Sequence, residues 1–200
     1  MRFILASSSP RRRELLASLR ITFEVLKPQI DEAQHPDEDP YDYVKRLSVE
    51  KAQAIAERIN TDAMILAADT IVLAADTIGM EESGGDILGK PIDADDARAT
   101  LKRLRGKAHI VCTAFTLLRL GTAPQQITEA VNTIVYMRDY TDDEIETYIA
   151  TGDPFDKAGS YAIQHTGFAP VERIEGDYNN VVGLPIEAVK AALQQMNYPI

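Results

Sequence analysis

A short apolar segment that runs into serines, a proline and three arginines is the feature that most constrains this chain. Residues 3–6 have the pattern of a buried strand that enters a turn. Ser9 is a preferred N-cap residue, and Pro10 suits the first position of a helix. The sequence therefore predicts a strand, a tight connection and a helix that begins at Pro10.

The arginines at 11–13 lie at the end of that helix where cations are unfavourable. The unpaired N–H groups of a helix N-terminus carry a partial positive charge, so each cation there costs about 0.3–1 kcal/mol. A bound anion would remove that cost. The hydroxyls of Ser7 and Ser9, together with backbone N–H and guanidinium groups, suit a polyphosphate. Arg12 continues the helical spacing of the following leucines, and we expect it to face inward. The alternative is a solvated basic turn that pairs with the acidic loop at 31–39.

A second unusual feature is an acid within a strongly apolar stretch. Residues 63–75 are typical of one strand, or of two strands with a break, and they contain Asp69 followed by Thr70. A carboxylate at the end of a buried strand is unfavourable unless it is paired, hydrogen-bonded or bound to a cation. Asp69 therefore either belongs to a functional site or caps a turn between two strands. Asp76 competes for the same role, because Ala-Ala-Asp-Thr-Ile occurs at 67–71 and again at 74–78.

Three lysines occupy positions from which they could meet an anionic ligand. Lys51 lies in line with the apolar positions of a predicted helix, so it either extends outward or points its charge into a site. Lys90 is held between a glycine and a proline, and Lys157 lies just before another predicted strand. Several lysines near turns and strand ends would suit a bound triphosphate. The pair Asp31-Glu32 either coordinates a hard cation or is solvated.

Composition excludes several classes of function. The 200 residues are 45% hydrophobic and 26% charged, which is enough to fill a core, and we expect a single domain over residues 1–200. The net charge of −10 disfavours binding to nucleic acid and to anionic membranes. Cys112, as the only cysteine, excludes an internal disulfide and a multi-cysteine metal site. Because no apolar run suits a signal peptide or a membrane span, we expect a soluble, cytoplasmic protein.

The rest of the pattern interleaves strands and helices, which indicates an α/β (mixed α+β) sheet protein. Further strands are predicted at 22–26, 109–120, 127–136, 161–163 and 170–174. Helices are predicted at 41–59, from the cap Asp93 to 104, from the capping box at 141–144 to 152, and at 185–196. Residues 79–85 read as a loop rich in glycine and glutamate.

With these residues assembled, the chain resembles the Maf family of nucleoside triphosphate pyrophosphatases over essentially its whole length. The motifs that carry the resemblance are Ala-Ser-Ser-Ser-Pro-Arg-Arg at 6–12, Glu-Lys-Ala at 50–52, Ala-Asp-Thr-Ile-Val at 68–72, Gly-Lys-Pro at 89–91, Asp-Lys-Ala-Gly at 156–159 and Val-Gly-Leu-Pro at 182–185. Several motifs in one order are far more specific than any one of them. The chain departs from the family in an insertion at 74–85, which contains the second Ala-Ala-Asp-Thr-Ile. We assign the first copy, because Ile-Val follows its Asp-Thr as in the family pattern.

The resemblance implies hydrolysis of a pyrimidine nucleoside triphosphate, dTTP or UTP, to the monophosphate and pyrophosphate. It also implies a divalent metal, Mg²⁺ or else Mn²⁺, and a cytoplasmic homodimer. The implied fold has two lobes around a central cleft, similar to that of inosine triphosphate pyrophosphatases. A non-catalytic nucleotide-binding module linked to septum formation is the alternative, and DNA binding is disfavoured by the net charge.

By the same resemblance, Asp69 matches the family's proton acceptor, and Glu32 matches the other essential carboxylate near the metal. Lys51 and Lys90 are the expected catalytic lysines. The expected substrate-binding residues are Ser7, Ser9, Arg11, Arg12, Thr70, Lys157 and Gln164. Among these, Arg11, Thr70 and Gln164 match positions associated with the choice of a pyrimidine. Gln164 carries both a donor and an acceptor, as reading the edge of a uracil or thymine ring requires.

Overall fold

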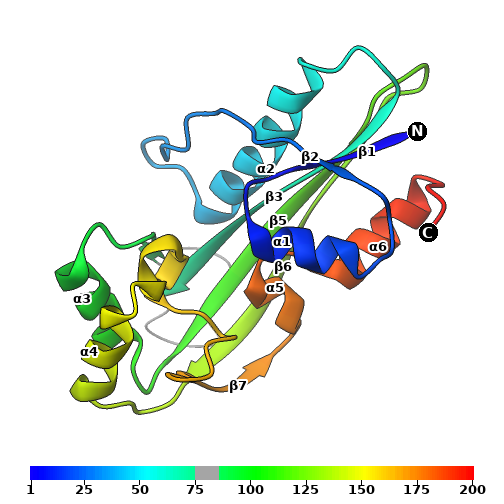
Figure 1. Ribbon diagram of the computed structural model, residues 1–200. Coiled ribbons are helices and arrows are strands. Elements are labelled where there is room, and N and C mark those ends of the chain that lie inside the picture. Colours follow the sequence, from blue (N-terminus) through cyan, green and yellow to red (C-terminus); the bar gives the residue numbers. More distant parts are fainter. Residues whose placement is uncertain (75–85) are drawn as a thin grey trace. The chain divides into compact units, whose positions relative to one another are not determined.

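The computed structural model describes residues 1–74 and 86–200 (Figure 1). Its strands are β1 (Arg2–Ala6), β2 (Glu24–Val25), β3 (Ala63–Ala74), β4 (Asp86–Leu88), β5 (Ala108–Arg119), β6 (Gln125–Met137) and β7 (Val171–Glu175). Its helices are α1 (Pro10–Ala17), α2 (Pro40–Ala56), α3 (Ala94–Leu104), α4 (Asp142–Ala150), α5 (Tyr178–Val182) and α6 (Ile186–Gln195), with 3₁₀ turns η1 (Asp153–Asp156) and η2 (Ala158–Ser160). Asp76 and the loop predicted at 79–85 lie outside the described residues. Within the described ranges, none of the helices is both long and apolar enough to cross a membrane.

One sheet contains all seven of the strands that the structure describes. Their order is β2-β1-β3-β5-β6-β7, with β4 paired to β3 beside that path. Strand β1 is parallel to both of its neighbours, whereas β4 and β7 are antiparallel to β3 and β6. Strands β5 and β6 are neighbours in the sheet and are joined by the short connection at 120–124. Helices alternate with these strands, so the predicted mixed α/β fold class is confirmed.

The chain divides into two compact units. The first comprises Met1–Asp69, Thr113–Val131 and Gly183–Ile200, and the second comprises Thr70–Cys112 and Asn132–Val182. Each unit has buried apolar residues of its own. The boundary in β3 falls between Asp69 and Thr70. The cleft that the family resemblance implies stays a prediction.

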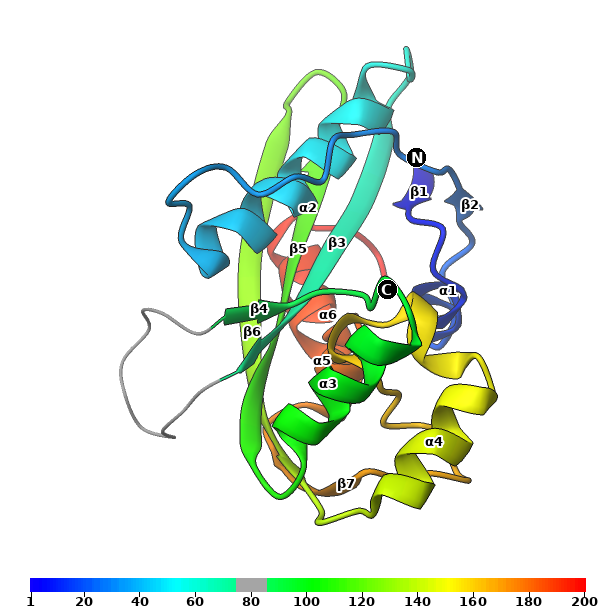
Figure 2. The same cartoon turned by 90° about the vertical axis from the view of Figure 1, so that its left-hand side faces the viewer.

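Alternation along β1 and β3 builds the core of the first unit. Phe3 and Leu5 belong to one apolar cluster, which includes Leu16 of α1 and residues of α6. Ile4 and Ala6 belong to another, which includes residues of α2. Because successive side chains of a strand point to opposite faces, the two clusters lie on the two faces of the sheet. Figure 2 shows α2 and α1 on opposite sides of β3. Because helices cover both faces of the sheet at β1 and β3, side chains on either face are buried, which explains why both strands are almost continuously apolar.

The second unit packs α3 and α4 side by side (Figure 2). Their apolar residues share a cluster with β5 and β6, and ion pairs such as Arg98–Glu146 connect their exposed faces. His109 of β5 is only 1% exposed, and its Nε2 lies 2.8 Å from the hydroxyl of Tyr161. Burial lowers the pKa of His109 to about 3, so the imidazole is neutral at physiological pH. The histidine therefore contributes to the core of this unit.

Local signals at the ends of helices locate most of the elements correctly. Ser9 caps α1 with Pro10 in its first turn, and Asp93 caps α3. Thr141 and Glu144 form the predicted capping box of α4. These side chains supply acceptors for N–H groups that have no partner within the helix, which is why such short patterns predict helix starts.

Three expectations about strands need correction. Residues 161–163 are irregular and lead into a turn at 163 rather than forming a strand, because the N–H of Ala162 donates to the Tyr148 hydroxyl instead of to a sheet neighbour. The strand predicted at 22–26 is reduced to Glu24–Val25. Strand β3 runs unbroken through Asp69, so the break considered at that point is absent. Helix α5 and strand β4 have no signal that periodicity detects, because they contain only five and three residues.

Candidate active site

The connection between β1 and α1 is organised by its serines. Ser7 is buried, and its hydroxyl accepts a hydrogen bond of 3.1 Å from the N–H of Ser9. The hydroxyl of Ser9 accepts from the N–H of Arg12 at 3.4 Å. The first turn of α1 contains no acidic residue. The predicted cluster of arginines at a helix start, here called the α1 mouth, is therefore present in the first unit. It lies at the N-terminal end of the helix, which favours anions.

Arg12 faces inward, as its spacing predicts. Its Nε donates to the carbonyl oxygen of Gly183 at 2.8 Å, and its Nη1 donates to that of Ala68 at 2.7 Å. Burial lowers the pKa of Arg12, and the negative charges of Asp69 and Glu32 act in the opposite direction. The guanidinium thus stands close enough to the two carboxylates to respond to their charge.

Lys51 forms ion pairs with both of the carboxylates that the sequence indicates, Asp69 and Glu32. Its ammonium lies 2.5 Å from Oδ1 of Asp69 and 2.8 Å from Oε1 of Glu32. The lysine is 7% exposed, so the alternative in which it extends into solvent is wrong. Because β3 continues past Asp69, that residue does not cap a turn either. A partly buried carboxylate is instead stabilised by an opposite charge, as the desolvation argument requires.

The loop that carries Glu32 is anchored on α2. The hydroxyl of Tyr43 donates to the backbone oxygen of Glu32 at 2.8 Å. Arg46 donates to Ala33 O at 3.0 Å and forms an ion pair of 2.6 Å with Glu38. That hydrogen-bonded pair lowers the pKa of Glu38 to about 2. Anchoring by Tyr43 and Arg46 was not predicted, although Arg46 is spaced for an i,i+4 pair on the helix, which it forms with Glu50.

The Asp69 and Glu32 carboxylates form a donor set suited to a hard cation. Burial raises the pKa of Tyr43, and the charges of Asp69 and Glu32 raise it further. Among the residues that the structure describes, no group of three acidic, histidine or cysteine side chains forms a candidate metal cage. Mg²⁺ commonly uses one or two carboxylates and completes its shell with water and substrate phosphates. The two oxygen donors that converge on the Lys51 ammonium therefore fit a divalent ion that arrives with a phosphate ligand.

Lys157, in the second unit, is buried and bonded to two aspartates close to it in the chain. Its ammonium donates to the backbone oxygen and Oδ1 of Asp153, at 2.7 and 2.9 Å, and to Oδ1 of Asp156 at 2.6 Å. The lysine is 8% exposed. Three acceptors match the three protons of an ammonium, so Lys157 fixes the turn in which it lies. Its expected contact with substrate stays a prediction.

Gly159 places this turn beside two other segments of the second unit. Its N–H donates to the oxygen of Gly89 at 3.1 Å, next to Lys90 in the chain. A Cβ at Gly159 would approach Val72 to 3.1 Å, and the φ of +71° is one that side chains disfavour. The expected site residues of this unit differ in exposure. Lys90 and Gln164 are exposed, and Thr70 is half-buried.

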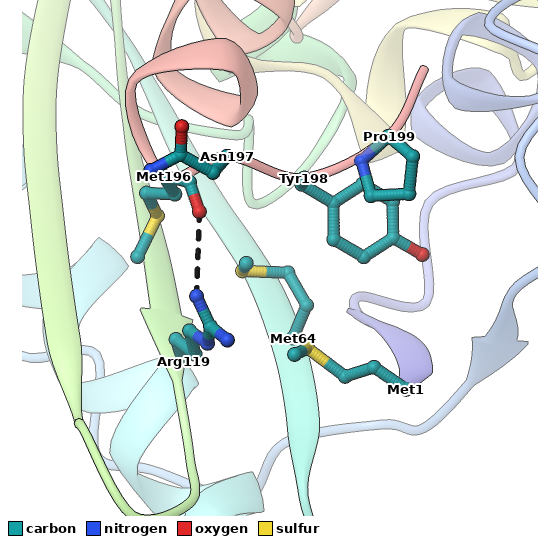
Figure 3. A pocket seen from close by; sticks show the side chains of 7 residues that line it. All are labelled: Met1, Met64, Arg119, Met196, Asn197, Tyr198 and Pro199. Carbon is teal, nitrogen blue, oxygen red and sulfur yellow. Dashed lines mark hydrogen bonds between the residues drawn. The ribbon is translucent and has the colours of Figure 1, made fainter.

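A pocket of about 240 Å³ lies elsewhere in the first unit (Figure 3). Figure 3 shows Met1, Met64, Arg119 and Tyr198 around it, with Arg119 donating to Met196 O at 3.4 Å. None of the expected site residues lines this pocket. It does not take part in the arrangement of Asp69, Lys51 and Glu32.

Fold and site together define a mixed α/β protein in which acidic and basic side chains converge at a strand residue beside a basic helix mouth. A family model described as "Maf-like protein" matches residues 2–196. A dTTP/UTP pyrophosphatase of Anaeromyxobacter dehalogenans is 44% identical over 200 residues, covering 100% of this chain and 96% of the relative. A dTTP/UTP pyrophosphatase of a Geobacter species is 46% identical and covers 96% of this chain and 93% of its own length. This chain belongs to the Maf family.

A solved structure, that of the Ham1 protein of Staphylococcus aureus, aligns with a TM-score of 0.48 at 11% identity. The alignment covers 98% of this chain and 100% of that one. A similarity at this level does not establish a shared fold.

The pairing of Lys51 with Asp69 is expected to be energetically coupled. In a double-mutant cycle of Lys51→Met and Asp69→Asn, we expect a coupling energy of about 1–3 kcal/mol. Lys51→Met leaves the partly buried Asp69 carboxylate without its ammonium, and Asp69→Asn leaves the buried ammonium with Glu32 in place of two carboxylates. Urea denaturation of the four proteins measures it. The pair Lys102–Asp142, whose side chains are 42% and 59% exposed, is the matched control. Its cycle should give less than about 1 kcal/mol. Equal coupling energies in the two cycles would contradict a specific role for the buried pair.

Proposed function

We propose that this chain hydrolyses dTTP and UTP to the corresponding monophosphate and pyrophosphate. Membership of the Maf family and the names of its relatives support this activity. The observation that carries it is the contact of Lys51 with both Asp69 and Glu32, beside the arginines of the α1 mouth. We propose further that residues 1–200 act as one functional domain.

Cleavage between the α- and β-phosphates requires an activated water and a stabilised leaving group. Water attacks the α-phosphorus, and Asp69 accepts one of its protons. The bond from the α-phosphorus to the bridging oxygen breaks, and pyrophosphate leaves with the electron pair. Lys51 holds Asp69 in place, and Lys51 and Lys90 supply positive charge for the departing oxygens. The reaction thus converts a triphosphate and water into a monophosphate, pyrophosphate and a proton.

A divalent cation fits the same carboxylates. Asp69 and Glu32 would hold it, with Mg²⁺ favoured by the oxygen donors and Mn²⁺ also compatible. When bound, the ion neutralises charge on the phosphate oxygens and lowers the barrier to attack. The hydrogen bond from Tyr43 keeps the backbone of Glu32 on α2, which preserves this donor set.

Substrate recognition combines phosphate and base contacts. Ser7, Ser9 and the N–H groups at the start of α1 bind phosphate oxygens. Arg11, Thr70 and Gln164 select the pyrimidine. The exposed amide of Gln164 offers one donor and one acceptor face, which match the alternating groups of a uracil or thymine edge.

The activity is tested by product analysis with Mg²⁺ and each nucleoside triphosphate. We expect pyrophosphate and monophosphate from dTTP and UTP, and a loss of about 100- to 10,000-fold in turnover for Asp69→Asn, because a general base is removed. Asp62→Asn, just before the start of the same strand, is the matched control and should remain active.

Asp76→Asn distinguishes the two Ala-Ala-Asp-Thr-Ile copies, and this variant should also remain active. Release of orthophosphate instead of pyrophosphate would contradict the proposed cleavage. An inactive Asp76→Asn with an active Asp69→Asn would transfer the role of the base to the second copy. Tight binding of dTTP without turnover by the unmodified chain would favour the non-catalytic module linked to septum formation.

The role of Gln164 is tested by nucleotide selectivity. For Gln164→Ala, we expect kcat/KM for dTTP to fall about tenfold, since one hydrogen-bonded contact contributes about 1 kcal/mol or more to recognition. Activity on poorly used purine triphosphates should change much less. Gln194→Ala, an exposed glutamine of α6, provides the control. An equal fall for every nucleotide would show that Gln164 does not read the base.

A further inference from the structure

The guanidinium of Arg12 donates hydrogen bonds to two backbone oxygens of its own unit. Nη1 donates to the oxygen of Ala68 at 2.7 Å, and Nε donates to the oxygen of Gly183 at 2.8 Å. Both are short for N–H···O bonds, as expected when the donor is charged. One side chain therefore connects three segments that are far apart in sequence: the start of α1, strand β3 and the residue at 183.

The carbonyl at 68 belongs to the peptide unit that leads into Asp69. This oxygen is held by a charged donor at 2.7 Å, so rotation of the peptide plane before Asp69 breaks a strong hydrogen bond. Ala68 itself is fully buried, which restricts the same backbone from the other side. Lys51 fixes the carboxylate end of Asp69, and Arg12 fixes its backbone end.

Gly183 supplies the second fixed point. Its φ of +120° is accessible mainly to glycine, and it lies immediately before the buried Leu184 that leads into α6. A guanidinium is a planar group with several donors at fixed angles, so it can meet two carbonyls at once without losing its geometry. An ammonium carries all its protons on one nitrogen, so it cannot donate from the two positions that Nε and Nη1 of Arg12 occupy.

We propose that Arg12 is a positioning residue, which orients Asp69 through the Ala68 carbonyl, and that phosphate binding at the α1 mouth is left to its other groups. The inference rests on the proposed function, in which Asp69 accepts the proton of the attacking water. It assigns Arg12 a role different from the phosphate contact that its place in the Ser-Pro-Arg-Arg motif implies. Loss of the two hydrogen bonds from Arg12 to the Ala68 and Gly183 oxygens displaces the Asp69 carboxylate relative to the substrate, without removing a substrate ligand.

The test separates turnover from binding. For Arg12→Lys and Arg12→Ala, we expect kcat for dTTP to fall about 100-fold, the size of effect that follows from a displacement of about 1 Å in a reacting group. We expect KM, and the Kd of a dTTP analogue with a non-hydrolysable α,β-imido bridge, to stay within about twofold. Guanidinium ion added to Arg12→Ala should restore part of kcat, and methylammonium should not. Arg58→Lys is the control, because Arg58 is an exposed arginine whose Nη1 also donates to a backbone oxygen, that of Lys27 at 3.2 Å, and this variant should behave as the unmodified chain.

Weaker binding of the analogue by about tenfold or more, with or without a change in kcat, would overturn the proposal, because Arg12 would then be a substrate ligand. An unchanged kcat in Arg12→Ala would overturn it as well. Thermal melting of every variant identifies a folding defect. If Arg12→Ala has one, the kcat and the analogue Kd of the milder variant Arg12→Lys test the proposal. The unmodified chain is assayed first. If it releases no pyrophosphate, the proposed function is wrong. If it does, and the Arg12 variants differ from the expected results, only the positioning role of Arg12 is wrong.

Discussion

The contact between Lys51 and Asp69 is the interaction on which the arrangement of the first unit depends. A carboxylate within a strand of a covered sheet would be expelled toward solvent if no opposite charge met it. The ammonium at 2.5 Å makes the acid compatible with β3, and its second contact at 2.8 Å brings Glu32 from a distant loop to the same point. Because Lys51 comes from the buried face of α2, the packing of that helix against the sheet also determines where the charges meet. Stability and site geometry thus depend on the same residue.

The second unit solves a related problem with a different lysine. Lys157 satisfies its charge within a single turn through Asp153 and Asp156. That turn then lies against Val72 and hydrogen-bonds to Gly89, the residue before Lys90. The two buried lysines therefore play distinct parts: one joins carboxylates from separate segments, and the other rigidifies the segment that contains it. Acidic residues far outnumber basic ones, yet each buried ammonium is placed where it neutralises a particular pair of carboxylates.

Local physics made much of this predictable from sequence. Ser9 and Pro10 fix the start of α1, helical spacing turns Arg12 inward, and the same spacing places Lys51 on the buried face of α2. Distant partners were not predictable in that way. The acceptors of Arg12 are backbone oxygens 56 and 171 residues away, and a backbone oxygen leaves no signature in the residue type. Residues 161–163 read as a strand because they are apolar, but the hydroxyl of Tyr148 captures the N–H that a sheet would need.

The central claim, that water attacks the α-phosphorus, is tested most directly by hydrolysis of dTTP in water enriched in oxygen-18. Mass spectrometry of the products locates the new oxygen. We expect one labelled oxygen per turnover in the monophosphate and none in pyrophosphate. Label in pyrophosphate would place the attack on the β-phosphorus and would contradict the mechanism assigned to this site.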